Sequence, residues 1–313
     1  MDKKEYLKII NQFKDLNIAV IGDYMLDKYI WGNCTRISPE APVPVVRIED
    51  EEYRLGGAGN VARNISSLGG KPNLLGICGN DNAGSRLATI LEKESINFEL
   101  IGNDEWLTTI KTRVLARGQQ IVRVDREKQD FLSEDVNMKV INTLKKTVQD
   151  YDVLVISDYG KGLINYKLLK TIRKIASLNK VKVFIDPKLP NFDLYQQSYL
   201  MTPNQKEAGS GAKISIDTQE KLLEAGEIIK ANNSCSNLLI TRGAQGMVLF
   251  SEEEKIWQIP TMARKVYDVT GAGDSFWSGF LTGILKGLPI KEAAKLGNAV
   301  AAFKIQGVGA LSS

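Results

Sequence analysis

Residues 268–274 read DVTGAGD, and an apolar run, SFWSGFLTGIL, follows over residues 275–285. We expect this run to be a helix, whose first backbone N–H groups would point at a ligand held beside the two glycines. An acidic side chain at an anion-binding helix start is unusual. Asp274 there suits a base that takes a hydroxyl proton next to an incoming phosphoryl group. The stretch therefore predicts phosphoryl transfer to an alcohol, the alternative being that Asp274 caps the helix and the glycines form an ordinary turn.

The composition excludes several other kinds of chemistry. The chain has 313 residues, 43% of them hydrophobic, which is enough for one large α/β domain. It has no histidine, which rules out Ser-His-Asp catalysis and His-ligated metals. The three cysteines are single and scattered, which favours a reducing cytosol and no structural zinc.

Charge and hydropathy give no sign of a nucleic-acid or membrane partner. Lys and Arg total 41 against 37 Asp and Glu, without a dense basic block. No secretion signal is evident at residues 1–10, and no apolar run approaches the ~20 residues that a membrane helix needs. We expect a cytoplasmic protein.

Short apolar runs alternate with segments of helical periodicity along the chain. The predicted strands cover residues 17–22, 73–77, 153–157, 181–185 and 238–241. Between the first two, residues 59–68 place their apolar side chains on one helical face. This alternation predicts a doubly wound α/β fold with a mainly parallel sheet. Asp23, Asp158 and Asp186 each follow or end a strand, so the site should lie beyond the carboxyl ends of the strands.

Two stretches interrupt this alternation and predict a small β-sheet lid. Residues 29–49 hold short β-rich runs, and residues 108–125 read as a hairpin that turns at Arg117 and Gly118. A lid over the ligand would exclude water. We expect a single domain over residues 1–313, with lid segments at about residues 28–54 and 106–125 inserted in it. An exposed lid with an apolar face also favours a homodimer formed through it.

Two motifs far apart in the chain identify a family. Residues 56–62 (GGAGNVA), with the LG of residues 68–69, and the DVTGAGD of residues 268–274 resemble the two signatures of the ribokinase-like carbohydrate kinases, also called the phosphofructokinase-B family. The resemblance runs over nearly the whole chain. It implies a ribokinase-like fold and an enzyme that uses ATP and Mg²⁺. No G-x-x-x-x-G-K-[ST] motif is present, which disfavours a Walker-type ATPase.

Further motifs resemble one branch of that family, the kinases of D-glycero-β-D-manno-heptose 7-phosphate. They are DYMLD at 23–27, RISPEAPVPV at 36–45, SDYGKG at 157–162, DPK at 186–188 and TPN at 202–204. The resemblance implies phosphorylation of O1 to give the 1,7-bisphosphate, on the route to ADP-heptose and the lipopolysaccharide core. Residues 36–45 are the most diagnostic, because generic ribokinases and fructokinases do not usually carry them. No nucleotidyltransferase half follows, so we expect a stand-alone kinase or the kinase domain of a longer enzyme.

The chemistry is expected at the second signature. Asp274 is the predicted base, and the backbone N–H groups of Gly271, Ala272 and Gly273 are expected to stabilise charge on the transferred phosphoryl group. Some ribokinase-like enzymes use a monovalent cation near this motif, and the resemblance makes Asp268 and Thr270 candidates for a K⁺ site.

The remaining predicted site residues hold the two substrates and the metal. Those expected to bind the sugar are Asp23, Asp27, Gly57, Asn60 and Lys161. Those expected by resemblance to bind ATP are Asn204, Thr241, Gly243, Gly246 and Asn298. The resemblance also implies that Glu207 organises Mg²⁺ through water. Asp27 could instead be a surface charge. Asn204 and Glu207 could instead form an ordinary helix start. The cations available for a substrate phosphate are Arg113, Arg117, Arg123, Lys161 and Lys188, and the sequence does not choose among them.

Other functions remain open on the sequence. A kinase of another sugar or sugar phosphate, such as fructose, ribose or fructose 6-phosphate, would share these motifs. A catalytically silent sugar-binding protein would share the fold. A Rossmann dehydrogenase is disfavoured, because no G-x-G-x-x-G follows the first strand.

Overall fold

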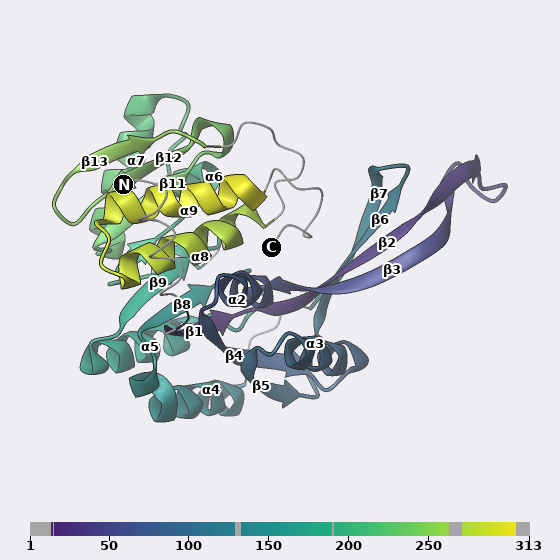
Figure 1. Ribbon diagram of the computed structural model, residues 1–313, viewed down its shortest axis with the longest axis horizontal. Coiled ribbons are helices and arrows are strands. Elements are labelled where there is room, and N and C mark those ends of the chain that lie inside the picture. The colour runs from purple at the N-terminus through teal and green to yellow at the C-terminus, as the bar shows by residue number, and fades with distance from the viewer. Residues whose placement is uncertain (1–13, 15, 129–132, 190, 263–270, 305–313) are drawn as a thin grey trace.

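The computed structural model of the chain describes residues 14, 16–128, 133–189, 191–262 and 271–304. The described residues form two sheets, one of nine strands between layers of helices and one of four strands that extends away from it (Figure 1). No helix among these residues is long and apolar enough to cross a membrane.

The nine-stranded sheet has the order β13-β12-β11-β10-β9-β8-β1-β4-β5. Its strands are β1 (Asn17–Gly22), β4 (Lys71–Gly79), β5 (Asn97–Asn103), β8 (Val153–Ser157), β9 (Lys182–Asp186), β10 (Leu200–Met201), β11 (Asn237–Thr241), β12 (Met247–Phe250) and β13 (Ile256–Ile259). All neighbours from β5 to β11 are parallel, and only β12 and β13 run antiparallel at one edge. The doubly wound, mainly parallel sheet predicted from the sequence is confirmed.

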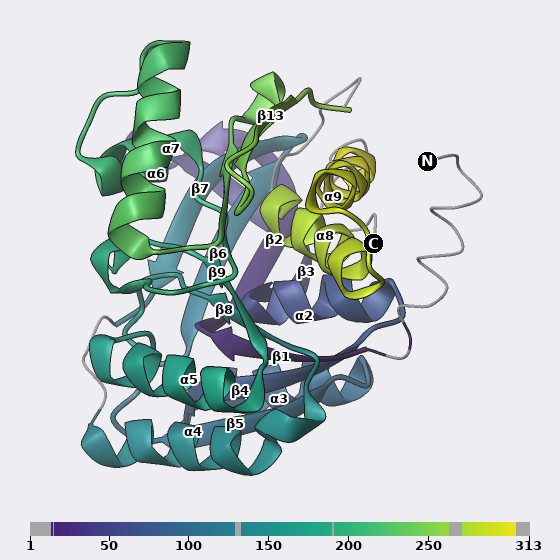
Figure 2. The same ribbon diagram turned by 90° about the vertical axis from the view of Figure 1, so that its left-hand side faces the viewer.

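Helices cover both faces of this sheet (Figure 2). One face carries α2 (Ala58–Ser67), α3 (Asn82–Lys93), α8 (Ala272–Leu285) and α9 (Ile290–Lys304). The other carries α4 (Glu134–Thr147), α5 (Tyr166–Asn179), α6 (Gln205–Ala212) and α7 (Gln219–Asn233). Short 3₁₀ turns lie at Val148–Asp150, Phe192–Leu194 and Gly243–Gln245. Strand residues alternate between the two cores: Val153 and Val155 of β8 face one, and Leu154 and Ile156 face the other.

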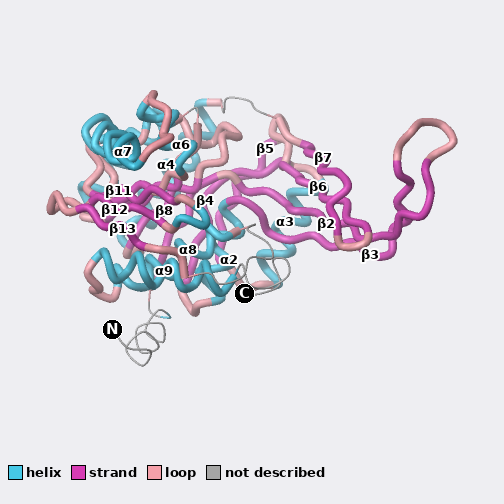
Figure 3. Tube along the Cα trace, turned by 90° about the horizontal axis from the view of Figure 1, so that it is seen from above, coloured by secondary structure: helices cyan, strands magenta, loops and turns pink. Residues whose placement is uncertain are grey.

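The four-stranded lid sheet has the order β3-β2-β6-β7. It consists of β2 (Tyr24–Ile37), β3 (Pro44–Gly57), β6 (Thr109–Ala116) and β7 (Gln119–Arg126), with β2 and β6 parallel and the other pairs antiparallel. Figure 3 shows the long β2–β3 hairpin projecting from the body. The hairpin predicted to turn at Arg117 and Gly118 is present, and both residues have the positive φ, 52° and 77°, that a tight two-residue turn requires.

The strand order reverses at β1. Strands β4 and β5 lie on one side of β1, and β8 to β11 lie on the other, so the carboxyl ends of β1 and β8 form a switch point where ligands bind in open α/β sheets. Gly22 ends β1 there, and a Cβ atom on it would lie 2.0 Å from the carbonyl oxygen of Ser157. This close approach needs glycine, and it places Asp23 and Asp158 side by side at the edge of the sheet.

Two boundaries differ from the sequence prediction. Helix α8 begins at Ala272, three residues before the apolar run, which puts Asp274 inside its first turn. In the lid, β2 and β3 are 14 residues each, much longer than the short runs expected, because they support each other through cross-strand pairing.

Candidate active site

A cavity of about 310 Å³ opens beyond the carboxyl ends of the parallel strands. Its wall is built from the segments after β8, β9 and β10, the end of β11 and the first turn of α8. Five segments that are distant in the sequence therefore meet at one edge of the sheet, where the pattern of strand-end polar residues predicts the site.

The first turn of α8 forms one side of the cavity. Gly271 is the N-cap residue and has a φ of 74°, and a Cβ atom there would lie 3.0 Å from the side-chain nitrogen of Asn60. Ala272, Gly273 and Asp274 follow and line the cavity with it. Since the first N–H groups of a helix have no partner within the helix, this turn presents donors to an anion, with a carboxylate beside them. Gly271 holds the N-cap position and the helix begins at Ala272, so Asp274 does not occupy the N-cap position that the alternative interpretation gave it.

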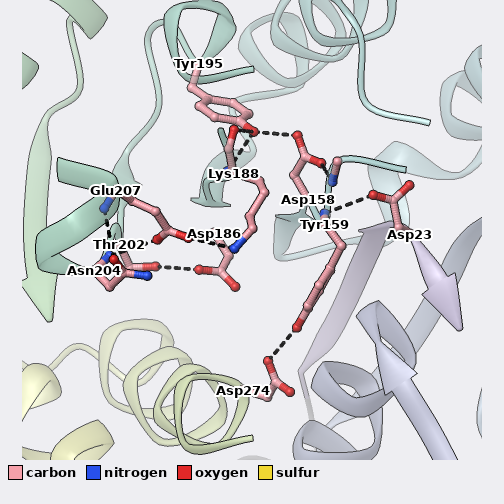
Figure 4. Close-up of polar contacts among 11 residues, drawn as sticks. Asp23, Asp158, Tyr159, Asp186, Lys188, Tyr195, Thr202, Asn204, Glu207 and Asp274 are labelled. Carbon is pink, nitrogen blue, oxygen red and sulfur yellow. Dashed lines mark hydrogen bonds and ion pairs between the residues drawn. The ribbon is translucent and has the colours of Figure 1, made fainter. Parts of the chain in front are cut away.

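Two side chains fix the orientation of the Asp274 carboxylate. The Tyr159 hydroxyl donates to Oδ1 at 3.1 Å, and the side-chain nitrogen of Asn60 donates to Oδ2 (Figure 4 shows the first contact). Tyr159 comes from the loop after β8 and Asn60 from α2, so elements from both sides of the switch point hold the carboxylate. Asp274 is only 7% exposed. A carboxylate held in this way is oriented before any ligand arrives.

One carboxylate oxygen of Asp23 finds no partner in the part of the chain that the structure describes. Its Oδ2 accepts hydrogen bonds from the backbone N–H groups of Tyr159 at 2.9 Å and Lys161 at 3.0 Å. Its Oδ1 is buried and accepts no hydrogen bond from the described residues. Burial, and then the neighbouring Asp158, raise the pKa of Asp23 to about 7. A buried acceptor of this kind needs a donor, which a hydroxyl group of a bound sugar would supply.

The other predicted sugar-binding residues lie around Asp23. Gly57 has a φ of 57°, and a Cβ atom on it would lie 2.4 Å from the backbone oxygen of Asp23. Asp27 is not a lone surface charge, because its Oδ1 accepts a hydrogen bond from the Arg113 guanidinium at 2.6 Å. The ammonium group of Lys161 contacts the Glu127 carboxylate at 2.6 Å.

Asn204 and Glu207 form the start of α6 and also line the cavity. Asn204 Oδ1 accepts from the Glu207 N–H at 2.9 Å, and Glu207 Oε2 accepts from the Asn204 N–H at 3.0 Å. This reciprocal capping is the ordinary helix start that the alternative interpretation of Asn204 and Glu207 predicts. It leaves Glu207 Oε1 to contact Lys188 at 3.0 Å. The structural role accounts for one oxygen of Glu207 and leaves the other facing the Lys188 ammonium group at the cavity.

Asp186 stands opposite Glu207 in the cavity wall (Figure 4). Burial raises its pKa well above the ordinary value, and the negative charges of Asp274 and Glu207 raise it further. Carboxylates crowded in this way are stabilised by a cation. Mg²⁺ is commonly held by one or two carboxylates together with substrate phosphates, so Asp186 and Glu207 fit such an ion.

The structure brings some of the predicted ATP-binding residues to the cavity and leaves others away from its wall. Thr241 lines the cavity. Gly243 and Gly246 lie in the loop after β11, with φ of 56° and 81°. Neither belongs to the cavity wall that the described residues form. Asn298 lies in α9, where its side chain donates to the Pro260 backbone oxygen at 2.6 Å. Asp268 and Thr270, the candidates for a K⁺ site, fall outside the described residues.

Comparison with known proteins settles the family. The family model of the pfkB family carbohydrate kinases matches residues 15–313. This chain belongs to that family. The membership confirms the carbohydrate-kinase class that the two signatures predict, in which ATP is the phosphoryl donor.

Relatives of this kinase are found both in sequence and in structure. The bifunctional protein HldE of Geotalea uraniireducens is 38% identical over 310 residues, and that of Aliarcobacter butzleri is 40% identical over 301. These alignments cover 99% and 96% of this chain but 63% of each relative. The chain thus spans less than two thirds of the length of these curated relatives.

Solved structures confirm the ribokinase-like fold. Phosphofructokinase-2 from Escherichia coli in complex with potassium superposes with a TM-score of 0.78 at 20% identity, over 94% of both chains. Ribokinase of Arabidopsis thaliana, complexed with ribose and ATP, gives 0.72 at 20% identity, over 95% of this chain and 94% of that one.

The sequence pattern did not identify two residues of this site, Asp186 and Tyr159. Asp186 ends β9, and its position at a strand end was the available signal. Tyr159 follows Asp158 by one residue, but its contact with Asp274 joins positions 115 apart in the chain. Nothing in the local pattern reports that contact.

Proposed function

We propose that this kinase transfers the γ-phosphoryl group of ATP to O1 of D-glycero-β-D-manno-heptose 7-phosphate, giving the 1,7-bisphosphate on the route to ADP-heptose and the lipopolysaccharide core. The support is the set of motifs at 23–27, 36–45, 157–162, 186–188 and 202–204. Relatives at 38% and 40% identity over nearly the whole chain, both named bifunctional protein HldE, agree with them.

The observation that carries the kinase mechanism is the geometry of Asp274. Its carboxylate lies in the first turn of α8 and is oriented by Tyr159 and Asn60. In the proposed reaction it accepts the proton of the O1 hydroxyl as that oxygen attacks phosphorus. The N–H groups of Gly271, Ala272 and Gly273 stabilise the charge on the transferred group. Asp23 accepts a hydrogen bond from a second sugar hydroxyl through its unpartnered oxygen, and Asp27, Gly57 and Asn60 complete the sugar site.

The nucleotide side uses Asn204, Thr241, Gly243, Gly246 and Asn298 in this proposal. Glu207, with Asp186 opposite, would hold Mg²⁺, which when bound neutralises charge on the ATP phosphates. Potassium is proposed as a second ion, at Asp268 and Thr270, since the related Escherichia coli phosphofructokinase-2 was solved in complex with it. Replacing K⁺ by Na⁺ at constant ionic strength tests this last point through the rate of ADP release.

The proposed enzyme is a single domain that works in the cytoplasm, where ATP is available, and forms a homodimer through its lid. The lid carries exposed apolar side chains on its outer strands, which support a contact between two copies. They are Ile48, Val122 and Val124, which are 56%, 47% and 57% exposed.

An ADP-release assay with ATP and Mg²⁺ tests the function. The acceptors are heptose 7-phosphate, sedoheptulose 7-phosphate, fructose 6-phosphate, fructose, ribose and adenosine. We expect selective turnover of heptose 7-phosphate, with phosphorus NMR placing the new phosphate on O1. Turnover of a different sugar alone would contradict the heptose assignment and keep the role of Asp274. No turnover with any acceptor would favour a silent sugar-binding protein.

A further inference from the structure

One buried hydroxyl group joins the two loops that follow β8 and β9. Tyr195 lies in the segment between β9 and β10, and its side chain is fully buried. Its hydroxyl donates to Oδ2 of Asp158, in the loop after β8, and accepts from the backbone N–H of Lys188, after β9, at 3.0 Å (Figure 4). Asp158 and Lys188 line the cavity, and Tyr195 does not belong to the wall that the described residues form. Any effect of Tyr195 on the reaction must therefore pass through these two loops.

The Asp158 carboxylate fixes the turn that presents Tyr159 to the site. Its Oδ1 accepts from the Gly160 backbone N–H at 2.6 Å, two residues along the chain, which closes an Asx turn around Tyr159. Gly160 has a φ of 67°, a conformation that glycine adopts readily. From the centre of this turn, Tyr159 donates its N–H to Asp23 at 2.9 Å and its hydroxyl to Asp274 at 3.1 Å. The position of Asp158 therefore decides where Tyr159 meets Asp274.

The other oxygen of Asp158 is held from the loop after β9. Besides the Tyr195 hydroxyl, Oδ2 accepts from the side-chain nitrogen of Asn191 at 2.8 Å. The Tyr195 hydroxyl has one hydrogen to donate, and the Lys188 carbonyl oxygen also lies within 3.2 Å, but a carboxylate is the stronger acceptor. Asp158 is buried, so its side chain cannot turn away without leaving polar atoms unpaired.

Tyr195 is itself held in place from α7. The side chain of Asn233 donates to the backbone oxygens of Phe192 and Tyr195, both at 2.9 Å. The Phe192 ring packs edge-on against the Tyr195 ring, with 6.2 Å between the ring centroids. Burial raises the pKa of Tyr195 well above its ordinary value, and the charge of Asp158 raises it further, so the hydroxyl keeps its proton and remains a donor. Phenylalanine would fill the same space, so the hydrogen bonds are what the hydroxyl adds.

We propose that Tyr195 is a positioning residue of this kinase, whose hydroxyl acts through Asp158 to hold the turn at residues 158–160, so that Tyr159 meets the Asp274 carboxylate. The inference rests on the proposed role of Asp274 as the base and adds a residue that acts on it from outside the cavity wall. Through the Lys188 N–H, the same hydroxyl ties this turn to the loop that carries the contact of Lys188 with Glu207.

A double-mutant cycle on kcat tests this role. Tyr195→Phe removes the hydroxyl and keeps the ring, and we expect kcat to fall by about 3- to 10-fold. In the Tyr159→Phe background, where the contact with Asp274 is already absent, the same substitution should change kcat by less than about 2-fold, because both changes act on one contact. Losses that multiply in the double variant would overturn the proposal, and so would a kcat of Tyr195→Phe within about 2-fold of the wild type.

Tyr24→Phe is the matched control for the loss of a buried hydrogen bond. The Tyr24 side chain is 4% exposed, and its hydroxyl donates to the Val20 backbone oxygen at 2.6 Å, within the core. We expect this variant to lower the melting temperature about as much as Tyr195→Phe does, while its kcat stays within about 2-fold of the wild type. A fall in kcat as large as that of Tyr195→Phe would assign the effect to general loss of stability and overturn the positioning role.

Asn191→Ala keeps the test decisive if Tyr195→Phe does not fold. It removes the other donor to Oδ2 of Asp158 from a half-buried loop position. We expect a smaller fall in kcat, about 2- to 5-fold, that disappears in the Tyr159→Phe background. An unchanged kcat, or a fall of the same size in that background, would overturn the proposal.

A crystal structure of Tyr195→Phe keeps this test distinct from that of the function. If the wild type turns over a different sugar, the heptose assignment is wrong, and the same cycle with that sugar decides the role of Tyr195. If it turns over nothing, the distance between the Tyr159 hydroxyl and Asp274 Oδ1 decides it. This distance is 3.1 Å in the wild type and should exceed about 3.5 Å in the variant. An unchanged contact would overturn the proposal, whatever the acceptor.

Discussion

The two sheets of this kinase bring different kinds of residue to one site. Strands β1 and β8 of the large sheet are buried along nearly their whole length. Asp23 follows β1, and Tyr159, in the loop after β8, donates hydrogen bonds to both Asp23 and Asp274. Strand β7 of the lid is exposed at every position, and the charged side chains on its inner face pair with one another. The comparison indicates that the large sheet holds the candidate reacting groups rigidly, while the lid presents paired charges on an exposed strand.

A substitution in the site held by the large sheet should have the largest effect on turnover. Asp274→Asn removes the base and keeps the shape of the side chain, so we expect kcat to fall by roughly 10²-fold or more, with ATP binding nearly intact. The measurements are ADP release for turnover and calorimetry for ATP. Asp150→Asn, at an exposed position outside the site, is the control and should leave both unchanged. Near-normal turnover in Asp274→Asn would remove Asp274 from this role.

Tyr159→Phe should produce a smaller change of a distinct kind. It removes the hydroxyl that donates to Asp274 at 3.1 Å and keeps the ring. We expect kcat to fall by about 10-fold. The acidic limb of the pH–rate profile should also move to higher pH, because the carboxylate loses a hydrogen bond that favours its ionised form.

The pH profile distinguishes positioning of the base from loss of packing. A merely structural role for Tyr159 would lower kcat without moving the limb. Tyr166→Phe, which removes a hydroxyl from a tyrosine that is 58% exposed, should change neither quantity.

The raised pKa of Asp23 can be tested through the pH dependence of the free energy of unfolding. Burial and Asp158 raise its pKa from 3.8 to about 7, so between these values the folded protein holds the proton more tightly than the unfolded chain. Stability therefore falls as pH rises through this window, by up to about 4 kcal/mol at about 1.4 kcal/mol per pKa unit. Asp23→Asn has no such proton to lose.

Urea denaturation at pH 5 and pH 8 measures this difference. The free energy of unfolding of Asp23→Asn relative to the wild type should rise by about 2 to 4 kcal/mol between the two pH values. The same variant should bind the acceptor less well, because its amide nitrogen cannot accept a hydrogen bond from the sugar hydroxyl. A stability difference independent of pH would show that Asp23 is ionised in both states.

The two sheets also differ in how far the sequence predicts them. Strands β1 and β8 lie where the apolar runs at 17–22 and 153–157 indicate, because a strand buried on both faces reads as a continuous apolar run. Strand β3 contains the charged run IEDEEYR, which carries no such pattern, and its length depends on pairing with β2. Local periodicity does not report that pairing.

The candidate site divides in the same way. The glycine-rich motif predicts Asp274 and the polar strand ends predict Asp23, whereas Glu207 comes from the resemblance to the family. The contact of Asp27 with Arg113 joins residues 86 apart, and the contact of Lys161 with Glu127 depends on how the lid sits over the sheet. These features follow from tertiary packing, which a single sequence does not display.

A substitution on the outer face of the lid, the face that carries Val122 and Val124, should have the smallest effect on catalysis. Val124 lies on the face opposite Lys111 and is 57% exposed, so Val124→Ser should weaken a dimer formed through the lid while changing kcat by less than about 2-fold. Light scattering after size-exclusion chromatography measures the mass. Ile256→Ser, at a residue 42% exposed on β13 of the large sheet, is the matched control and should leave the mass unchanged. A dimer that survives Val124→Ser but dissociates with Ile256→Ser would place the interface on the large sheet.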